Sequence, residues 1–171
     1  MNNIYIAATL KDCGKTSVTL GLMQQLREIG HNPGYIKPVG QQYIEHNGQK
    51  LDEDAVLILD GLGFQIDNPK DMSPIAIERG FTKKYINHPD PTRLENKIHN
   101  AFSKLNGNHE LNLVEGTGHA HTAAHIIEDE ELGHRTEECG VGNAGRGQVG
   151  LCGRCHRTRI ALRFFSRSPR V

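Results

Sequence analysis

The triplet Gly14-Lys15-Thr16 has the residue types that a phosphate-binding loop requires, in the expected order. Such a loop needs backbone N–H groups that point inward, a lysine that reaches the β- and γ-phosphates, and a hydroxyl that ligates Mg²⁺. Thr9 stands where the usual spacing places a first glycine, so the motif is incomplete. The alternative interpretation is an ordinary helix N-terminus with a solvated lysine. We predict binding of a nucleoside triphosphate with Mg²⁺ through ten residues: Lys11, Asp12, Cys13, Gly14, Lys15, Thr16, Ser17, Gly116, Thr117 and Gly118.

Three further ionisable residues are candidates for chemistry. Glu115 ends an apolar run and precedes Gly116-Thr117-Gly118, and ligands of open α/β sheets lie beyond the carboxyl ends of the strands. An acid there can hold Mg²⁺, because hard cations prefer oxygen ligands; the alternative is a solvated acid. Asp54 is either a second carboxylate for the metal or an acid that interacts favourably with a helix dipole. Lys37 lies at the end of a second apolar run, so we expect it at the same sheet edge as Glu115, where a lysine suits an anionic substrate or the γ-phosphate; the alternative is a surface lysine.

The elements that must position these residues alternate between strand and helix. Residues 4–8 and 34–39 are short apolar runs typical of buried strands. Between them, apolar residues at spacings of three and four over 18–29 predict an amphipathic helix, which gives a βαβ unit. Helices are also expected over 52–62 and 94–105, and a third strand over 111–114. The fold class is therefore α/β, with a mostly parallel sheet of the P-loop NTPase type, apparently truncated, because no strand is expected after residue 120.

The charge distribution divides the chain into two parts. The net charge of +0 combines −6 over residues 1–133 with +6 over residues 134–171, and the last lysine is Lys104. We therefore expect a nucleotide-binding domain over 1–120 and an irregular, disordered Arg/Gly-rich tail over 121–171. The tail arginines carry no nucleic-acid-reading motif, so nucleic acid is not an expected partner. No apolar run reaches the roughly 20 residues that cross a bilayer, and the first residues do not resemble a signal peptide, so we expect a cytoplasmic location.

The tail cysteines allow two metal chemistries. Residues 152–156 fit the Cys-x-x-Cys-His pattern of covalent haem attachment, which the lack of an export signal disfavours. A zinc site is the other reading, although one Cys-x-x-Cys pair is present where strong zinc patterns have two. Its ligands would be Cys139, Cys152, Cys155 and His156.

Four motifs occur in the order found in one known superfamily: residues 4–16, 34–40, 54–56 and 114–119. They resemble the dethiobiotin synthetase-like P-loop superfamily, and most closely the dethiobiotin synthetase-like domain at the N-terminus of phosphotransacetylases. Residues 71–74 and 79–82 add to the narrower match. The resemblance covers about residues 1–120.

The resemblance implies a division of roles. Lys15 and Thr16 hold ATP and Mg²⁺, Asp54 and Glu115 complete the metal site, and Lys37 engages the substrate carbamate. Lys37 and Lys15 are thus the expected catalytic residues if the chain is an enzyme. GTP stays open as an alternative to ATP, and a homodimer is an open arrangement by the same resemblance.

Three hypotheses about function remain open at this point. The first is Mg²⁺-dependent binding of a nucleoside triphosphate in a regulatory domain, because the resemblance implies a phosphotransacetylase-type domain, which is usually regarded as regulatory or of unknown activity. The second is an ATP-dependent carboxylating ligase. The third is a truncated or frame-shifted inactive product, because the family pattern stops near residue 120 where arginine replaces lysine.

Overall fold

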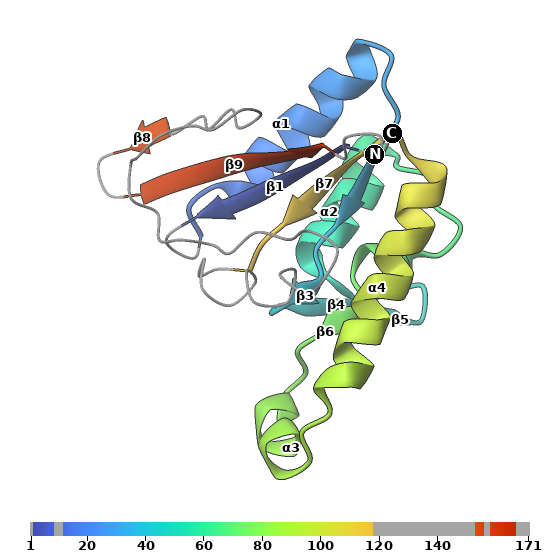
Figure 1. Ribbon diagram of the computed structural model, residues 1–171, viewed down its shortest axis with the longest axis vertical. Coiled ribbons are helices and arrows are strands. Elements are labelled where there is room, and N and C mark those ends of the chain that lie inside the picture. The colour runs from blue at the N-terminus through green and yellow to red at the C-terminus, as the bar shows by residue number, and fades with distance from the viewer. Residues whose placement is uncertain (1, 9–11, 118–152, 156–157, 167–171) are drawn as a thin grey trace, which may run out of the picture.

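The computed structural model describes residues 2–8, 12–117, 153–155 and 158–166. Three strands form a parallel core: β1 (Asn2–Ala8), β2 (Pro33–Ile36) and β7 (Leu111–Glu115), with β7 between the other two. β9 (Thr158–Ser166) pairs antiparallel with the outer side of β1, and β8 (Gly153–Cys155) pairs with β9. The sheet order is β2-β7-β1-β9-β8 (Figure 1). The expected parallel α/β architecture is confirmed.

Helices cover both faces of this sheet (Figure 1). On one face, α1 (Lys15–Glu28) and α2 (Glu53–Leu62) pack on the strands, and Met23 and Ile58 meet Ile6 and Leu113 in one buried cluster. On the other face, α4 (Pro91–Asn108) packs through a second cluster on β2 and β7, made of Ile36, Ala101, Leu105 and Val114. The alternation of side chains along each strand sends successive apolar residues to opposite clusters.

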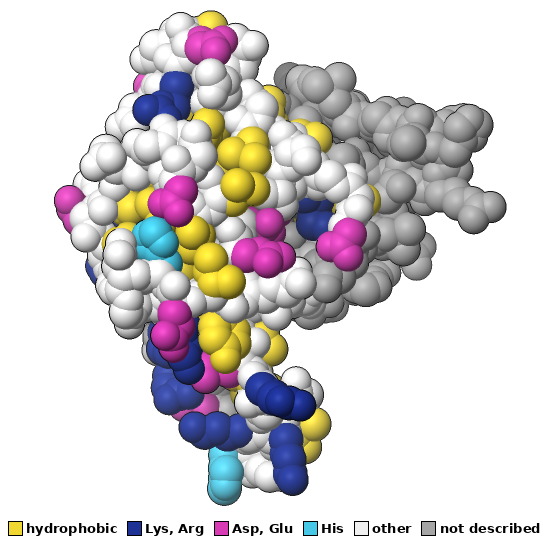
Figure 2. All heavy atoms as spheres, turned by 180° about the vertical axis from the view of Figure 1, so that it is seen from behind, with side chains coloured by type: hydrophobic (Ala, Val, Ile, Leu, Met, Phe, Trp, Pro, Cys, Tyr) yellow, Lys and Arg dark blue, Asp and Glu magenta, His cyan; other side chains and the backbone are white. Residues whose placement is uncertain are grey.

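Short elements connect the layers. β3 (Val39–Gly40) pairs with β6 (Ile75–Ala76), and η1 (Pro69–Met72) is a 3₁₀ turn before β6. β4 (Tyr43–His46) and β5 (Gln49–Asp52) form a hairpin. Its turn is Asn47-Gly48, with φ of 50° and 75°, which is the backbone that an Asn-Gly hairpin turn favours. α3 (Phe81–Asn87) projects from the body, and Lys and Arg side chains gather on this projection (Figure 2).

Two expectations about the elements need correction. The predicted second strand over 34–39 is two strands, β2 and β3, separated by Lys37-Pro38. The expectation that no strand follows residue 120 is wrong for residues 153–155 and 158–166, because β9 pairs with β1 from Asn2 to Ala8. The other residues of the tail lie outside the described part of the chain, so the disorder expected there stays a prediction. No helix among the described residues is long and apolar enough to cross a membrane.

Candidate functional site

The loop after β1 leads directly into the N-terminus of α1. Gly14 is the N-cap residue, and its φ of 88° lies in the left-handed region that glycine adopts without strain. Within the described residues no side chain caps the helix, and the N–H of Val18 donates to the Gly14 carbonyl at 3.0 Å. The first-turn N–H groups of a helix lack intrahelical acceptors and carry a partial positive charge. This end of α1 therefore suits an anion.

Glu115, the last residue of β7, forms a hydrogen bond with the first turn of α1. Its Oε1 accepts a hydrogen bond from the Thr16 hydroxyl at 2.9 Å, and its Oε2 accepts one from the Tyr35 hydroxyl at 3.1 Å. The residue is 0% exposed. Burial raises the pKa of Glu115, and the nearby charge of Asp54 raises it further, while Lys37 and the Thr16 hydroxyl act in the opposite direction. An ionised carboxylate here is costly, and a nearby cation would lower that cost.

Lys37 lies directly after β2 and is held by two carboxylates. Its Nζ is 2.8 Å from Asp52 Oδ1 and also forms an ion pair with Asp54 Oδ2. Burial acts to lower the pKa of Lys37, but the charges and hydrogen bonds of Asp52 and Asp54 together raise it. Lys37 is therefore a charged ammonium group at the edge of the site and is not the surface lysine of the alternative interpretation.

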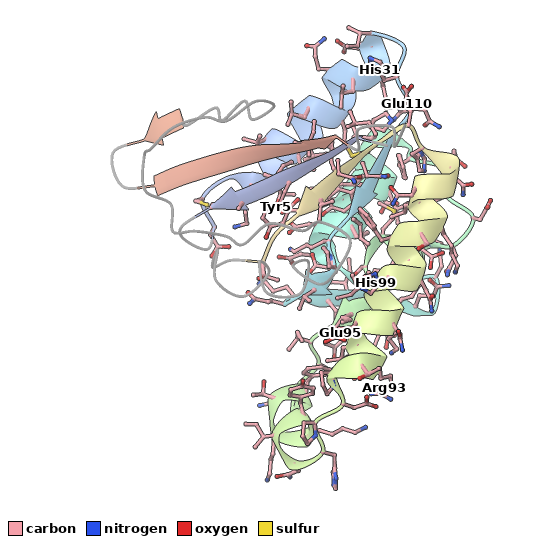
Figure 3. All side chains as sticks on the ribbon, viewed as in Figure 1. Tyr5, His31, Arg93, Glu95, His99 and Glu110 are labelled. Atoms are coloured by element: carbon pink, nitrogen blue, oxygen red, sulfur yellow. The ribbon has the colours of Figure 1, made fainter. Side chains whose placement is uncertain are left out.

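The residues directly after β7 form one wall of the site. The N–H of Gly116 donates to the Ile6 carbonyl at 2.9 Å, and a Cβ at Gly116 would lie 2.6 Å from the Tyr5 hydroxyl oxygen. Tyr5 lies on β1 (Figure 3), and burial raises its pKa to about 12. Thr117 is buried, and its hydroxyl has no hydrogen-bond partner among the described residues. A side chain at position 116 would therefore require the Tyr5 ring to shift, and Thr117 leaves a polar atom at the pocket wall.

One pocket gathers most of the predicted site residues. It lies at the carboxyl ends of β1, β2 and β7, whereas the ion pair between His31 and Glu110 lies at the opposite end of the sheet (Figure 3). The pocket has polar walls from the loop, the strand ends and the start of α2. Its predicted lining residues are Asp12, Cys13, Gly14, Lys15, Thr16, Lys37, Asp54, Glu115, Gly116 and Thr117.

One of the predicted nucleotide-binding residues does not line the pocket, and two others fall outside the part of the chain that the structure describes. Ser17 lies in the first turn of α1, where it is exposed and does not line the cavity. Lys11 and Gly118 lie outside the described residues. The side chains of the predicted zinc site, Cys139, Cys152, Cys155 and His156, lie outside the described part as well.

Several residues of the site were missed at the level of sequence. Asp52 is the buried partner of Lys37, and Tyr35 is the buried donor to Glu115. Asp52 also accepts a hydrogen bond from the Asp54 N–H at 3.1 Å as the N-cap residue of α2, and an acid directly before a helix is the signal that identifies it. No local pattern in the sequence identifies Tyr35 as a site residue. The alternation of side chains along β2 predicts only that Tyr35 faces the core. The remaining lining residues, Gln41, Gln42 and Glu53, were also not predicted.

The oxygen donors of the pocket suit Mg²⁺ that is bound jointly with substrate phosphates. They suit less well a metal ion whose ligands all come from the protein. No group of three or more His, Cys, Asp or Glu side chains able to hold a metal occurs in the described ranges. Mg²⁺, however, is usually bound through one or two carboxylates together with substrate phosphates. Asp54 and Glu115 both line the pocket with the Thr16 hydroxyl, and the charge of Asp54 raises the pKa of Glu115. A divalent cation would relieve this repulsion between the carboxylates.

Comparison with known proteins places the chain in a family. A family model described as "AAA domain" matches residues 2–130. The chain is 27% identical over 119 residues to the ATP-dependent dethiobiotin synthetase BioD of Caldicellulosiruptor saccharolyticus, covering 69% of this chain and 49% of the relative. It is 28% identical over 123 residues to the same-named protein of Nitrosopumilus maritimus, covering 69% and 51%. A phosphate acetyltransferase of Pseudomonas aeruginosa is 27% identical over 129 residues, covering 74% of this chain and 17% of that protein.

The chain spans about half the length of the dethiobiotin synthetases that it matches. The matched region includes the phosphate-binding loop, α2 with its N-cap and the end of β7, which are the elements that form the pocket. The resemblance seen in the sequence motifs is thereby confirmed. The chain belongs to the AAA domain family and is a dethiobiotin synthetase-like P-loop domain related to phosphate acetyltransferase.

Proposed function

We propose that the chain binds ATP together with Mg²⁺ in the pocket at the carboxyl edge of the sheet. The observation that carries this proposal is the convergence of Lys15, Thr16 and Glu115, which come from two separate elements and line one cavity at the N-terminus of α1. Lys15 would contact the phosphates, and Thr16 with Glu115 and Asp54 would hold Mg²⁺. A bound Mg²⁺ would supply charge neutralisation for the phosphates. Relatives named as ATP-dependent support ATP over GTP.

The test is calorimetric titration of the full chain with Mg·ATP, compared with Lys15→Ala. A charge-assisted contact to phosphate contributes roughly 1.5–3 kcal/mol, so the variant should bind about ten-fold to over a hundred-fold more weakly. Lys83→Ala on α3 is the matched control, because Lys83 lies on the exposed projection away from the pocket. Equal affinity of Lys15→Ala and the parent protein would refute the assignment. Mg·GTP and ATP with EDTA, titrated in parallel, measure nucleotide choice and metal dependence.

A second candidate is a ligase that carboxylates an amine with ATP, and the placement of Lys37 favours it. Its ammonium group lines the same pocket as Lys15, where an anionic intermediate would meet the terminal phosphate. The relatives' name, dethiobiotin synthetase, motivates the assay: ADP release from ATP with a diamino acid and bicarbonate. ADP formation that needs both co-substrates supports the ligase, whereas tight Mg·ATP binding without turnover supports a regulatory binding domain.

The third hypothesis, an inactive product, makes a separate prediction. A chain without a functional site would show the same melting temperature with and without Mg·ATP. A ligand present at 100 times its dissociation constant stabilises the folded state by about 2.7 kcal/mol, so binding would raise the melting temperature measurably.

A further inference from the structure

The positive charge of Lys37 is more than balanced by the two carboxylates around it. Its ammonium group meets the carboxylates of Asp52 and Asp54, so the three side chains together carry a net negative charge when all are ionised. An anion that approaches this corner meets that negative charge, with Glu115 also on the pocket wall. Lys37 in this arrangement therefore does not attract an anion by itself, although a lysine at a strand end ordinarily suits one.

The two carboxylates that hold Lys37 differ in how firmly they are fixed. Asp52 has no exposed surface, and its Oδ1 accepts from the Asp54 N–H while its Oδ2 accepts from the Gln42 N–H at 3.4 Å. The Asp52 N–H donates to the buried Ser73 hydroxyl at 3.0 Å. A Cβ on Gly40 would lie 2.5 Å from the Asp52 side chain, so the packing there has no spare room. Asp52 is thus a fixed partner of Lys37.

Asp54 is the exchangeable partner. Its side chain is 20% exposed and lines the pocket with Thr16 and Glu115, and among the described residues Lys37 is the ion-pair partner of its carboxylate. The same carboxylate is the residue that the proposed function assigns to Mg²⁺. A cation of higher charge competes with the ammonium group for this carboxylate. If Asp54 turns to a metal, Lys37 keeps Asp52 and has an N–H available to the pocket.

We propose that Lys37 binds an oxyanion only when a divalent cation holds Asp54, so that the metal controls access of an anion to the lysine. This inference rests on the proposed function, because it takes the metal site from it. The anion is an oxyanion, and it has two sources: the terminal phosphate of the nucleotide, or the carboxylate of a second ligand. By linkage, metal and anion then strengthen the binding of each other by the same factor.

The experiment measures anion binding in the absence of metal. It uses a variant that imitates the state in which Asp54 no longer pairs with Lys37. Asp54→Asn removes the exchangeable carboxylate and keeps both the backbone N–H to Asp52 and the buried Lys37–Asp52 pair. In EDTA buffer, inorganic sulfate should bind this variant at least about five-fold more tightly than it binds the parent protein, the lower end of typical coupling between sites. Acetate in a parallel titration separates the sources: preference for sulfate indicates phosphate, and preference for acetate indicates a carboxylate.

Glu53→Gln is the matched control, since Glu53 lines the same pocket and precedes Asp54 in α2, whereas the ion pairs of Lys37 among the described residues are with Asp52 and Asp54. It makes the same change in charge, and sulfate affinity should rise much less. The gain in Asp54→Asn should also disappear when Lys37→Met is added, with thermal melting to verify that each variant is folded. Equal gains in Asp54→Asn and Glu53→Gln, no gain in Asp54→Asn, or a gain that survives Lys37→Met would each overturn the inference. Binding of Mg·ATP to the parent protein tests the proposed function separately, so each can fail while the other stands.

Discussion

Glu115→Gln is the substitution that most directly tests what an ionised, buried carboxylate at position 115 costs in stability without a metal ion. Glu115 is fully buried, and its two oxygens accept from the hydroxyls of Thr16 and Tyr35. Glutamine has nearly the same shape, and its oxygen and NH₂ group can pair with two hydroxyls, because a hydroxyl both donates and accepts. The substitution therefore removes the charge while it preserves the hydrogen bonds.

The direction of the effect follows from the pKa of Glu115. Burial, and then the charge of Asp54, raise that pKa above the ordinary value of 4.5, so ionisation is disfavoured in the folded state. For such a group the contribution to stability is fully present below pH 4.5 and is lost as the pH rises through the folded-state pKa. Without metal, Glu115→Gln should thus stabilise the protein at neutral pH by on the order of 1 kcal/mol, or roughly 2–4 °C in melting temperature. This gain should vanish in acid.

The assay is urea and thermal unfolding of both proteins in EDTA from acid to neutral pH, repeated with Mg·ATP. With Mg·ATP the order should reverse, because the variant loses a metal ligand and with it most of the stabilisation by ligand. If Glu115→Gln destabilises the protein at neutral pH in EDTA, the buried carboxylate is stabilised by its surroundings and the reasoning is wrong. If Mg·ATP stabilises both proteins equally, Glu115 is not a metal ligand.

Two further substitutions test the supports of the site. Gly40→Ala should lower the free energy of unfolding by about 1–3 kcal/mol, because the added Cβ would lie 2.5 Å from Asp52. Gly61→Ala in α2 is the control: the nearest side-chain atom to its added Cβ is 4.0 Å away, so the change should be neutral or stabilising by about 0.5–1 kcal/mol. Equal effects in urea unfolding would show that Asp52 is not tightly packed. Tyr35→Phe should cost about 1–3 kcal/mol in the same assay, because it leaves Glu115 Oε2 without its donor. An unchanged midpoint would contradict the importance of this hydrogen bond.

Local patterns in the sequence predicted the elements of the site well. The apolar run 4–8 and the periodicity over 18–29 are local signals, and β1 and α1 formed where they indicated. Glycine at position 14 was expected at a strand-to-helix turn, and its φ of 88° supplies the reason. The carboxyl ends of parallel strands meet at one edge, so Lys37 and Glu115 were expected to lie together, and both line the pocket.

The pairing of the charged groups was decided only by tertiary structure. Lys37 and Asp52 are 15 residues apart, and their ion pair depends on how β5 and the start of α2 pack beside the end of β2. The hydrogen bond from Tyr35 to Glu115 spans 80 residues and needs β2 beside β7 in one register. The pairing of β9 with β1 joins segments more than 150 residues apart, and no local pattern marked it. Sequence patterns report the face and the edge on which a residue lies, whereas partner, burial and pKa depend on contacts between distant segments, which have no local signature.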